Sequence, residues 1–496
     1  MNETIFMLAI DFIALIGVIV LLLVVTALVA AVVMYQIDKR QTAHTIRRNY
    51  PLLGRFRYLF EELGEFFRQY FFAMDREEMP FNRAQRSWVY RAAKNIDNTV
   101  AFGSTRDLRK PGTYYFLNCP FPTLSEDAAS TQPMRIGPYC RTPYDAPSLL
   151  NISGMSFGAL SAPAVQALSM GAAKAGCWMN TGEGALSKHH LHGGCDIVFQ
   201  IGTAKYGVRD EEGRLDDSRL AELAAIEQVR MFEIKLSQGA KPGKGGILPG
   251  DKVTPEIAEA RGIPVGQASI SPNRHPEIAC IDDLLDFIAH VRDVTGKPVG
   301  FKLVLGTTDW LDSFCEAVIK RGSESAPDFI TLDSADGGTG AAPMPLMDSV
   351  GLPLRESLPL LVNKLSQHNL RNRVRVIASG KLINPTDVAA AICLGADFVV
   401  TARGFMFALG CIQALQCNKN TCPTGITTHD PKLQKGLVPE VKAARVANFH
   451  HNLVHEVELI AHACGVTEPR QLRREHAAVV VDGGTAVPLD ILYPRS

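Results

Sequence analysis

From about residue 149 onward, short apolar runs ending in Gly-, Ser- or Thr-rich turns recur, and this recurrence restricts the fold more than any other feature. Helical patterns lie between them, as at 161–176, 282–296 and 384–396. Alternating strand and helix units predict a parallel sheet. Roughly eight such units in about 270 residues match the size of a (β/α)8 barrel. The apolar runs lie at 149–160, 177–184, 231–246, 298–306, 328–343, 374–382 and 397–405.

A doubly wound sheet is the alternative arrangement for such units. It is the weaker one, because no GxGxxG dinucleotide fingerprint follows the first candidate strand. We therefore expect an α/β TIM barrel over residues 149–430.

Cys411, Cys417 and Cys422 form a C-x5-C-x4-C run that directly follows the last candidate strand. Closely spaced thiolates suit an iron–sulfur cluster. Because three cysteines are one short of the usual four, we expect a three-iron cluster or a cubane with one other ligand. The spacing differs from the usual motifs, so three unrelated buried cysteines are the alternative.

Glycine-containing turns end the last three candidate strands. In a barrel these ends face the mouth where chemistry occurs, and loops there bind phosphate through backbone N–H groups and a helix N-terminus. Each turn alone could be only turn chemistry. Together they favour FMN, because a flavin passes electrons singly to a cluster and as a hydride to a substrate. The expected cofactor-binding residues are Gly338, Thr339, Gly340, Ser379, Gly380, Lys381, Arg403 and Gly404.

Residues 12–37 carry no formal charge and are long enough to span a bilayer as a helix. A signal peptide is the competing interpretation, but the apolar run is too long and no positive segment precedes it. Lys39, Arg40, Arg47 and Arg48 follow it, so the positive-inside rule places the remainder in the cytoplasm. We expect a single-pass anchor at 1–37 in the cytoplasmic (inner) membrane. The odd number of cysteines, 11, fits reduced thiols there.

Residues 38–148 form the expected membrane-proximal region. Its aromatic, helical part, 50–100, could pack on the catalytic domain or lie at the membrane interface, and 103–148 is expected to be an irregular link. Residues 431–496 form an expected helical extension. The 51 basic and 51 acidic side chains balance, which argues against nucleic acid as a partner.

Five motifs together resemble the FMN-binding synthase domain of glutamate synthase. They are SGMSFGALS, NTGEG, KLSQGAKPGKGGILPGDKV, DGGTGAAP and GCIQALQCNKNTCPTGITT. The whole chain is similar to stand-alone, membrane-anchored FMN-binding glutamate synthase-like proteins of bacteria, over about residues 80–430. The resemblance implies an FMN barrel with a 3Fe-4S cluster on the three cysteines. It also implies an oxidoreductase that reduces 2-iminoglutarate, formed from 2-oxoglutarate and ammonia, to L-glutamate.

The resemblance also suggests roles for individual residues. Met155, Ser156 and Thr181 can line the flavin at the ends of the first two strands. Lys235, expected to end the third strand, could stabilise negative charge on the reduced flavin, or could be a core lysine paired with a carboxylate. Glu183 is a candidate acid or relay, with a capping or hydrogen-bonding role as the alternative.

Gln238, Lys241 and Arg261 match positions that hold the dicarboxylate substrate in the family. Two cations suit two carboxylates, whereas without the resemblance a solvated basic loop would be the preferred interpretation.

Two departures put 2-oxoglutarate itself in doubt. Lys244 replaces a glutamate of the full-length enzyme, and the segment 185–196 replaces an acidic one, both near the expected mouth. His189, His190, His192 and Cys195 in that segment match no strong metal pattern and are expected in a loop lining the mouth. A different oxo or amino acid substrate and a non-catalytic membrane electron-transfer subunit are the alternative functions.

The expected partners follow from modules that the sequence does not show. There is no recognisable glutaminase or NAD(P)H-binding module, so we expect free or partner-derived ammonia. Electrons are expected from ferredoxin or a reductase subunit. A homo-oligomer is possible.

Overall fold

The computed structural model describes residues 2–494, and the chain divides into two compact units, residues 1–84 and 85–496. The first unit is helical. Its first helix contains a stretch, Ile5–Arg40, whose length and hydropathy would allow it to cross a membrane. Its elements are α1 (Asn2–Arg40), α2 (Thr45–Asn49), α3 (Leu53–Phe67) and a π-helical turn (Arg68–Phe72), and α4 (Arg83–Ala93) begins at the boundary.

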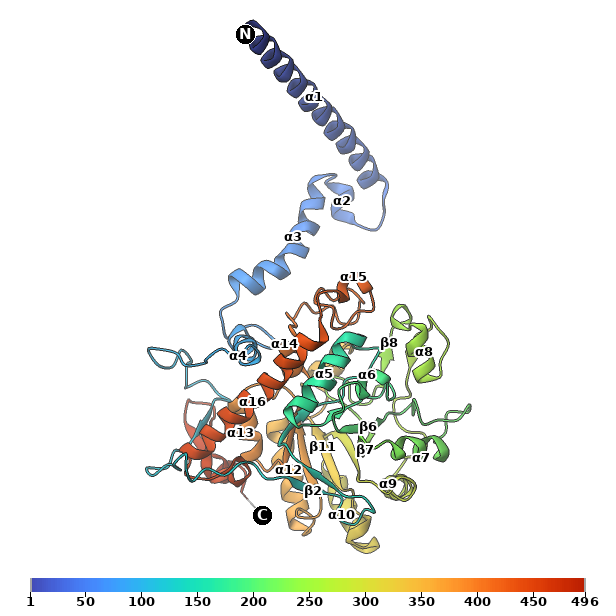
Figure 1. The fold of residues 1–496 in the computed structure, drawn as a ribbon, viewed down its shortest axis with the longest axis vertical. Coiled ribbons are helices and arrows are strands. Elements are labelled where there is room, and N and C mark those ends of the chain that lie inside the picture. Colours follow the sequence, from blue (N-terminus) through green and yellow to red (C-terminus); the bar gives the residue numbers. More distant parts are fainter. Residues whose placement is uncertain (1, 495–496) are drawn as a thin grey trace. The chain divides into compact units, whose positions relative to one another are not determined.

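The second unit is built on a closed barrel of eight parallel strands, which confirms the predicted (β/α)8 fold (Figure 1). Neighbouring strands pair in chain order, and the last strand pairs with the first to close the ring. The strands are β4 (Leu150–Ile152), β5 (Met179–Asn180), β6 (Ile197–Ile201), β7 (Val229–Lys235), β10 (Val299–Val304), β11 (Phe329–Asp333), β12 (Arg375–Ser379) and β13 (Phe398–Thr401).

Outer helices connect the strands, and the three that the sequence predicts, at 161–176, 282–296 and 384–396, are present. The first, for example, starts after Ser161, whose hydroxyl accepts the N–H of Ala164, and ends at Gly176 in the left-handed conformation, with φ of 68°. The helices are α5 (Ala162–Ala175), α7 (Asp217–Ala225), α9 (Ile281–Thr295), α10 (Asp309–Arg321), α12 (Leu354–Gln367), α13 (Pro385–Cys393) and α14 (Arg403–Leu409).

One strand was missing from the sequence prediction. Strand β6 follows the segment 185–196 and is buried along its whole length. Lys235 therefore ends the fourth strand of the barrel, β7, and not the third, so that prediction was wrong.

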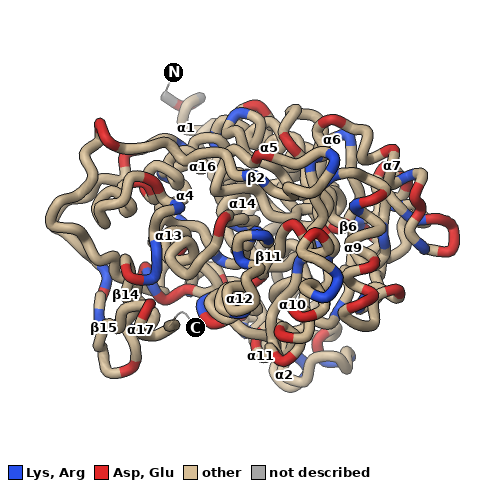
Figure 2. Tube along the Cα trace, turned by 90° about the horizontal axis from the view of Figure 1, so that it is seen from below, with Lys and Arg blue, Asp and Glu red and all other residues tan. Residues whose placement is uncertain are grey.

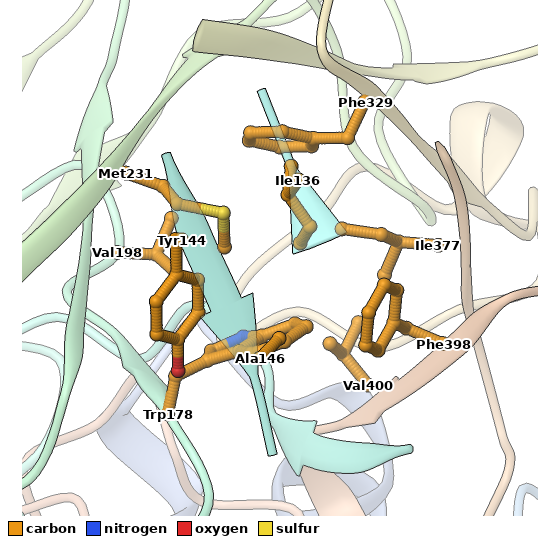
Figure 3. Close-up of a cluster of buried hydrophobic side chains, with 10 residues drawn as sticks. All are labelled: Ile136, Tyr144, Ala146, Trp178, Val198, Met231, Phe329, Ile377, Phe398 and Val400. Carbon is orange, nitrogen blue, oxygen red and sulfur yellow. The ribbon is translucent and has the colours of Figure 1, made fainter. Parts of the chain in front are cut away.

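An apolar plug closes the amino-terminal end of the barrel. It comes from the hairpin of β2 (Met134–Ile136) and β3 (Tyr144–Ala146), which lies in the segment predicted to be irregular. Figure 3 shows Ile136 and Tyr144 of this hairpin among side chains from the starts of the strands, including Trp178, Phe329 and Phe398. Apolar side chains fill this end of the barrel.

A further layer covers one side of the barrel. The long helix α16 (Pro439–Ala463) packs along α5, and β1 (Tyr114–Phe116) pairs with β14 (Ala477–Val480), which pairs with β15 (Ala486–Pro488). The C-terminal segment thus contains strands as well as helices. Basic and acidic residues are interspersed around the molecule in Figure 2, in keeping with the balanced composition. The two short helices of the C-terminal segment are α15 (Pro431–Gln434) and α17 (Leu489–Leu492).

Candidate functional site

An ion pair lies at the open end of the barrel. Glu183 follows β5, and its Oε1 is 3.0 Å from Nζ of Lys235, the last residue of β7. Lys235 also donates to the side-chain oxygen of Gln238. Although burial by itself raises the pKa of Glu183, the charge of Lys235, assisted by Lys241 and Arg261, holds it below its ordinary value. Glu183 is therefore an anion among cations.

Two further cations face this carboxylate. Lys241 is 4% exposed, and burial together with the charge of Lys235 lowers its pKa to about 8. Arg261 ends α8 (Pro255–Arg261), is 5% exposed, and donates to the hydroxyl of Ser269 at 3.2 Å and to the Phe157 carbonyl at 3.4 Å. Its Nε finds no hydrogen-bond partner among the described residues. A buried guanidinium without a carboxylate contact is suited to an anionic ligand.

These side chains line one cavity of about 170 Å³ at the mouth of the barrel. Its charged lining consists of five cations and one carboxylate. A cavity with this excess of positive charge favours an anionic ligand. It brings together most of the predicted site residues: Met155, Ser156, Glu183, Lys235, Gln238, Lys241, Arg261, Gly338, Thr339, Gly340 and Arg403.

An adjoining cavity of about 70 Å³ contains the remaining predicted phosphate-binding residues, Ser379, Gly380 and Lys381, together with Arg403. Lys381 pairs with Asp336 at 2.9 Å, and Arg403 donates to the Thr339 carbonyl at 3.0 Å. The two cavities share lining residues, including Gly154, Gln200 and Lys235. This basic recess, lined in part by Gly338, Gly340 and Gly380, would accommodate the phosphate of a flavin.

Two predicted cofactor residues lie outside both cavities. Thr181 is buried beneath the mouth, where its hydroxyl accepts the N–H of Gln200 at 3.0 Å and donates to the Gly182 carbonyl at 2.9 Å. Gly404 lies in α14, where a Cβ would come within 2.8 Å of the Phe449 ring. Thr181 thus shapes the strand end, and Gly404 allows α14 to approach α16.

The two substitutions expected near the mouth do not line the cavities. Lys244 is exposed and lines neither cavity. In the segment 185–196, α6 (Lys188–Leu191) lies behind the site: His189 is 3.0 Å from Glu256, and His190 donates to the Met155 carbonyl at 3.2 Å. The expectation of a mouth-lining loop was therefore wrong. These two changes do not touch the cavity.

The barrel interior beneath the site is unexpectedly polar. Glu233 is buried and accepts hydrogen bonds from Asn180, Gln200 and Thr331, at 2.8, 2.7 and 2.6 Å. Lys302 pairs with Asp333 at 3.1 Å in the same layer. No sequence motif had indicated these residues, which fix Gln200 in the cavity wall.

Cys411, Cys417 and Cys422 line an adjoining cavity of about 120 Å³. Within residues 2–494, no three His, Cys, Asp or Glu side chains converge closely enough to hold one metal ion. A cluster places each thiolate on a different iron atom, so cysteines distributed around a cavity fit it where a single ion would not. This cavity shares Thr339, Gly340, Arg403, Met406, Cys417 and Thr427 with the first.

Lys252, which no sequence motif had indicated, lines the first cavity and bonds to Cys417, a residue that lines both. It is 2% exposed, and its Nζ donates to the carbonyls of Ala159 and Cys417, at 3.1 Å each. His275 is a second residue that no sequence motif had indicated. Its Nε2 donates to the Lys235 carbonyl at 3.0 Å. Burial lowers the pKa of His275 to about 4, so it is neutral.

Comparison with known proteins gives consistent results. Residues 128–467 match the family described as a conserved region in glutamate synthase. The chain is 40% identical to the glutamate synthase large subunit-like protein YerD of Bacillus subtilis over 494 residues, covering 92% of this chain and 93% of that one. It is 37% identical to the archaeal glutamate synthase [NADPH] of Methanocaldococcus jannaschii over 324 residues, covering 65% of this chain and 60% of that one.

The archaeal-type glutamate synthase [NADPH] of Thermotoga neapolitana is 34% identical over 329 residues, covering 66% of this chain and 61% of the relative. The chain thus spans about three fifths of the length of these NADPH-dependent relatives. Among solved structures, a mutant flavocytochrome b2 with benzoylformate is 16% identical, with 82% of each chain covered and a TM-score of 0.47. That similarity is too low to support a functional argument.

Proposed function

The chain belongs to the glutamate synthase family of oxidoreductases, and from this premise we propose that it reduces 2-iminoglutarate, formed from 2-oxoglutarate and ammonia, to L-glutamate. The proposed cofactors are FMN in the barrel mouth and a 3Fe-4S cluster on Cys411, Cys417 and Cys422.

The observation that carries the proposal is the charge of the main cavity. Five cationic side chains face a single carboxylate there. We assign Arg403, which lines the second cavity with Ser379 and Gly380, to the flavin phosphate, and the Lys252 ammonium is hydrogen-bonded to two carbonyls. Lys235, Lys241 and Arg261 then remain beside Glu183 for an anionic substrate, and the positive charge of this group favours a dicarboxylate.

In this proposal, side chains of the protein bind the dicarboxylate substrate and supply the proton that the imine nitrogen receives. Lys241 and Arg261 bind the two carboxylates, and Arg261 has an unused buried N–H with which to do so. Reduction of the imine requires a hydride and a proton. The Lys235 ammonium has three N–H donors, of which one points to Glu183 and one to Gln238. We assign to the third the proton that reaches the imine nitrogen, with Glu183 orienting the ammonium.

When bound, FMN supplies the hydride and the cluster supplies electrons singly. The shared wall between the two cavities, which includes Cys417, supports this pairing of cofactors. We propose that the electrons come from ferredoxin or a separate reductase subunit, and that free or partner-derived ammonia is used.

We also propose that α1 anchors the protein in the cytoplasmic membrane with residues 85–496 on the cytoplasmic side. Its apolar length supports an anchor, and Lys39, Arg40, Arg47 and Arg48 at its C-terminal side support this orientation.

An anaerobic absorption experiment tests the reaction. Protein purified with its cofactors is reduced with dithionite, and 2-oxoglutarate and ammonia are then added. Reoxidation of the flavin with formation of glutamate is the expected result. A bound flavin that stays reduced would reject this substrate pair, and reoxidation by another oxo acid would identify a different substrate. A flavin that no oxo acid reoxidises would favour an electron-transfer subunit.

A further inference from the structure

Helix α3 presents an apolar stripe to solvent. Its apolar residues recur at intervals of three and four, which places them on one side of the helix. Each is between 37% and 71% exposed, and a contiguous exposed apolar stripe of this kind marks an interaction surface. The stripe consists of Leu53, Phe56, Leu59, Phe60, Leu63, Phe66 and Phe67.

A joint of buried contacts holds α3 to the end of α1. The Asp38 carboxylate is fully buried and accepts hydrogen bonds from Arg47 at 2.7 Å, from Arg55 at 2.8 Å and from the Leu52 N–H at 3.1 Å. Gly54 allows α2 to approach, since a Cβ there would be 2.9 Å from the Arg47 Cα. The start of α3 therefore cannot move far from the end of α1, and the two helices run in different directions in Figure 1.

The contacts of the joint do not involve the apolar stripe of α3. The ring of Tyr58 packs against His44 at 4.9 Å, and Gly54 contacts α2. At 100° per residue, both positions lie on the side of α3 away from Phe60 and Phe56. The contacts with His44 and α2 thus come from one side of α3, and they leave the apolar stripe on the other side exposed.

Basic residues border the joint. Lys39, Arg40, Arg48 and Arg57 are exposed, whereas Glu61, Glu62 and Glu65 lie on the polar side of α3. Cations next to an apolar helix face are typical of a segment that lies on an anionic lipid surface.

We propose that the apolar stripe of α3 lies in the headgroup region of the same anionic bilayer that α1 enters, so that α1 and α3 form one two-part anchor. This inference rests on the proposed membrane anchoring of α1. The Asp38 contacts hold α3 next to the basic end of α1. A membrane that surrounds that end of α1 is therefore also within reach of the stripe, and for this reason we choose the bilayer as its binding surface. Phenylalanine and leucine, the residues of the stripe, are also suited to the apolar face of an interfacial helix.

Photocrosslinking of the full-length protein tests the proposal. Benzoylphenylalanine is placed singly at position 60 or 67 in the stripe, at 65 on the polar side, or at 24 within α1, and each variant is reconstituted in phosphatidylglycerol-containing vesicles. Mass spectrometry then identifies the adducts. We expect lipid adducts at positions 60 and 67 in several-fold excess over position 65.

Other products would overturn the inference. Crosslinks from position 60 to residues 85–496 would show that the stripe packs on the catalytic unit, and crosslinks to a second copy would show a dimer contact. Lipid adducts at 24 but not at 60 or 67 would reject the role of α3 and retain the anchor. Absence of lipid adducts at 24 would instead refute the anchoring on which the inference rests.

Discussion

The Glu183 carboxylate lies 3.0 Å from the Lys235 ammonium and has no space to retreat, because a Cβ at Gly246 would be 2.1 Å from Glu183 Oε1. The carboxylate is thus held between the Lys235 ammonium on one side and the backbone of Gly246 on the other. This arrangement fixes the position of the lysine in the cavity wall.

Replacement of the carboxylate by its amide, Glu183→Gln, should therefore reduce turnover more than binding. We expect kcat to fall by about 10²- to 10⁴-fold, the usual contribution of a positioned proton donor. KM for 2-oxoglutarate should stay equal or fall, since one negative charge is removed. Steady-state kinetics at matched flavin content measure both. A raised KM with unchanged kcat would assign Glu183 to substrate binding.

Gly246→Ala should have a similar effect without changing any polar group. The added methyl displaces the Glu183 carboxylate, so we expect a large loss of kcat with flavin still bound. Gly436→Ala is the matched control, because nothing lies within 4 Å of a Cβ at that position. Equal activity of the two variants would show that the position of Glu183 does not matter for turnover.

Substrate binding should weaken above pH 8. Lys241, whose pKa is lowered to about 8, is charged below that pH and neutral above it in the free enzyme. Only the charged form attracts a carboxylate, so Kd for 2-oxoglutarate should rise with pH, by at most about tenfold per pH unit. Calorimetric titration between pH 7 and 9.5 measures this. Lys241→Met should bind weakly and without that dependence, and an unchanged slope would assign the titration to another group.

The features that could be predicted from the sequence are those that depend on neighbouring residues, such as helix ends and strand–loop alternation. Ser161 and Gly176 mark the ends of α5 by capping chemistry that acts within one turn. The strand end that carries Lys235 and the turn after β13 that leads to Arg403 follow from strand–loop alternation. The fold class was therefore predictable. The strand β6 was missed because its continuous burial gives no alternation, and the interpretation of the preceding segment as a loop concealed it.

Contacts between distant segments were not predictable. Lys252 bonds to carbonyls 93 and 165 residues away, and the hairpin that plugs the barrel consists of three-residue strands without a periodic pattern. The position of Lys244 outside the cavity likewise depends on the path of the loop, which composition does not specify.

Lys252→Met should destabilise the fold locally. The change keeps the length of the side chain but leaves the carbonyls of Ala159 and Cys417 without a donor, at a cost of about 2–4 kcal/mol in unfolding free energy. Urea denaturation measures this loss, and iron content should fall because the cysteine loop is released. Lys244→Met, at an exposed position, should change stability by less than about 0.5 kcal/mol. Equal stability of the two variants would show that the bridge contributes nothing.

Cys417 lies in the wall common to both cavities, so its replacement separates the two proposed cofactors. Cys417→Ser should lose the iron–sulfur absorbance while retaining FMN, because the basic recess for the flavin does not depend on the thiol. Electron delivery from a protein donor should then fail, although dithionite should still reduce the flavin. Cys280→Ser, which alters an exposed thiol distant from the cavities in sequence, should retain iron. If Cys417→Ser retained its full iron content, the three-cysteine assignment would be wrong, and electrons would have to reach the flavin by another route.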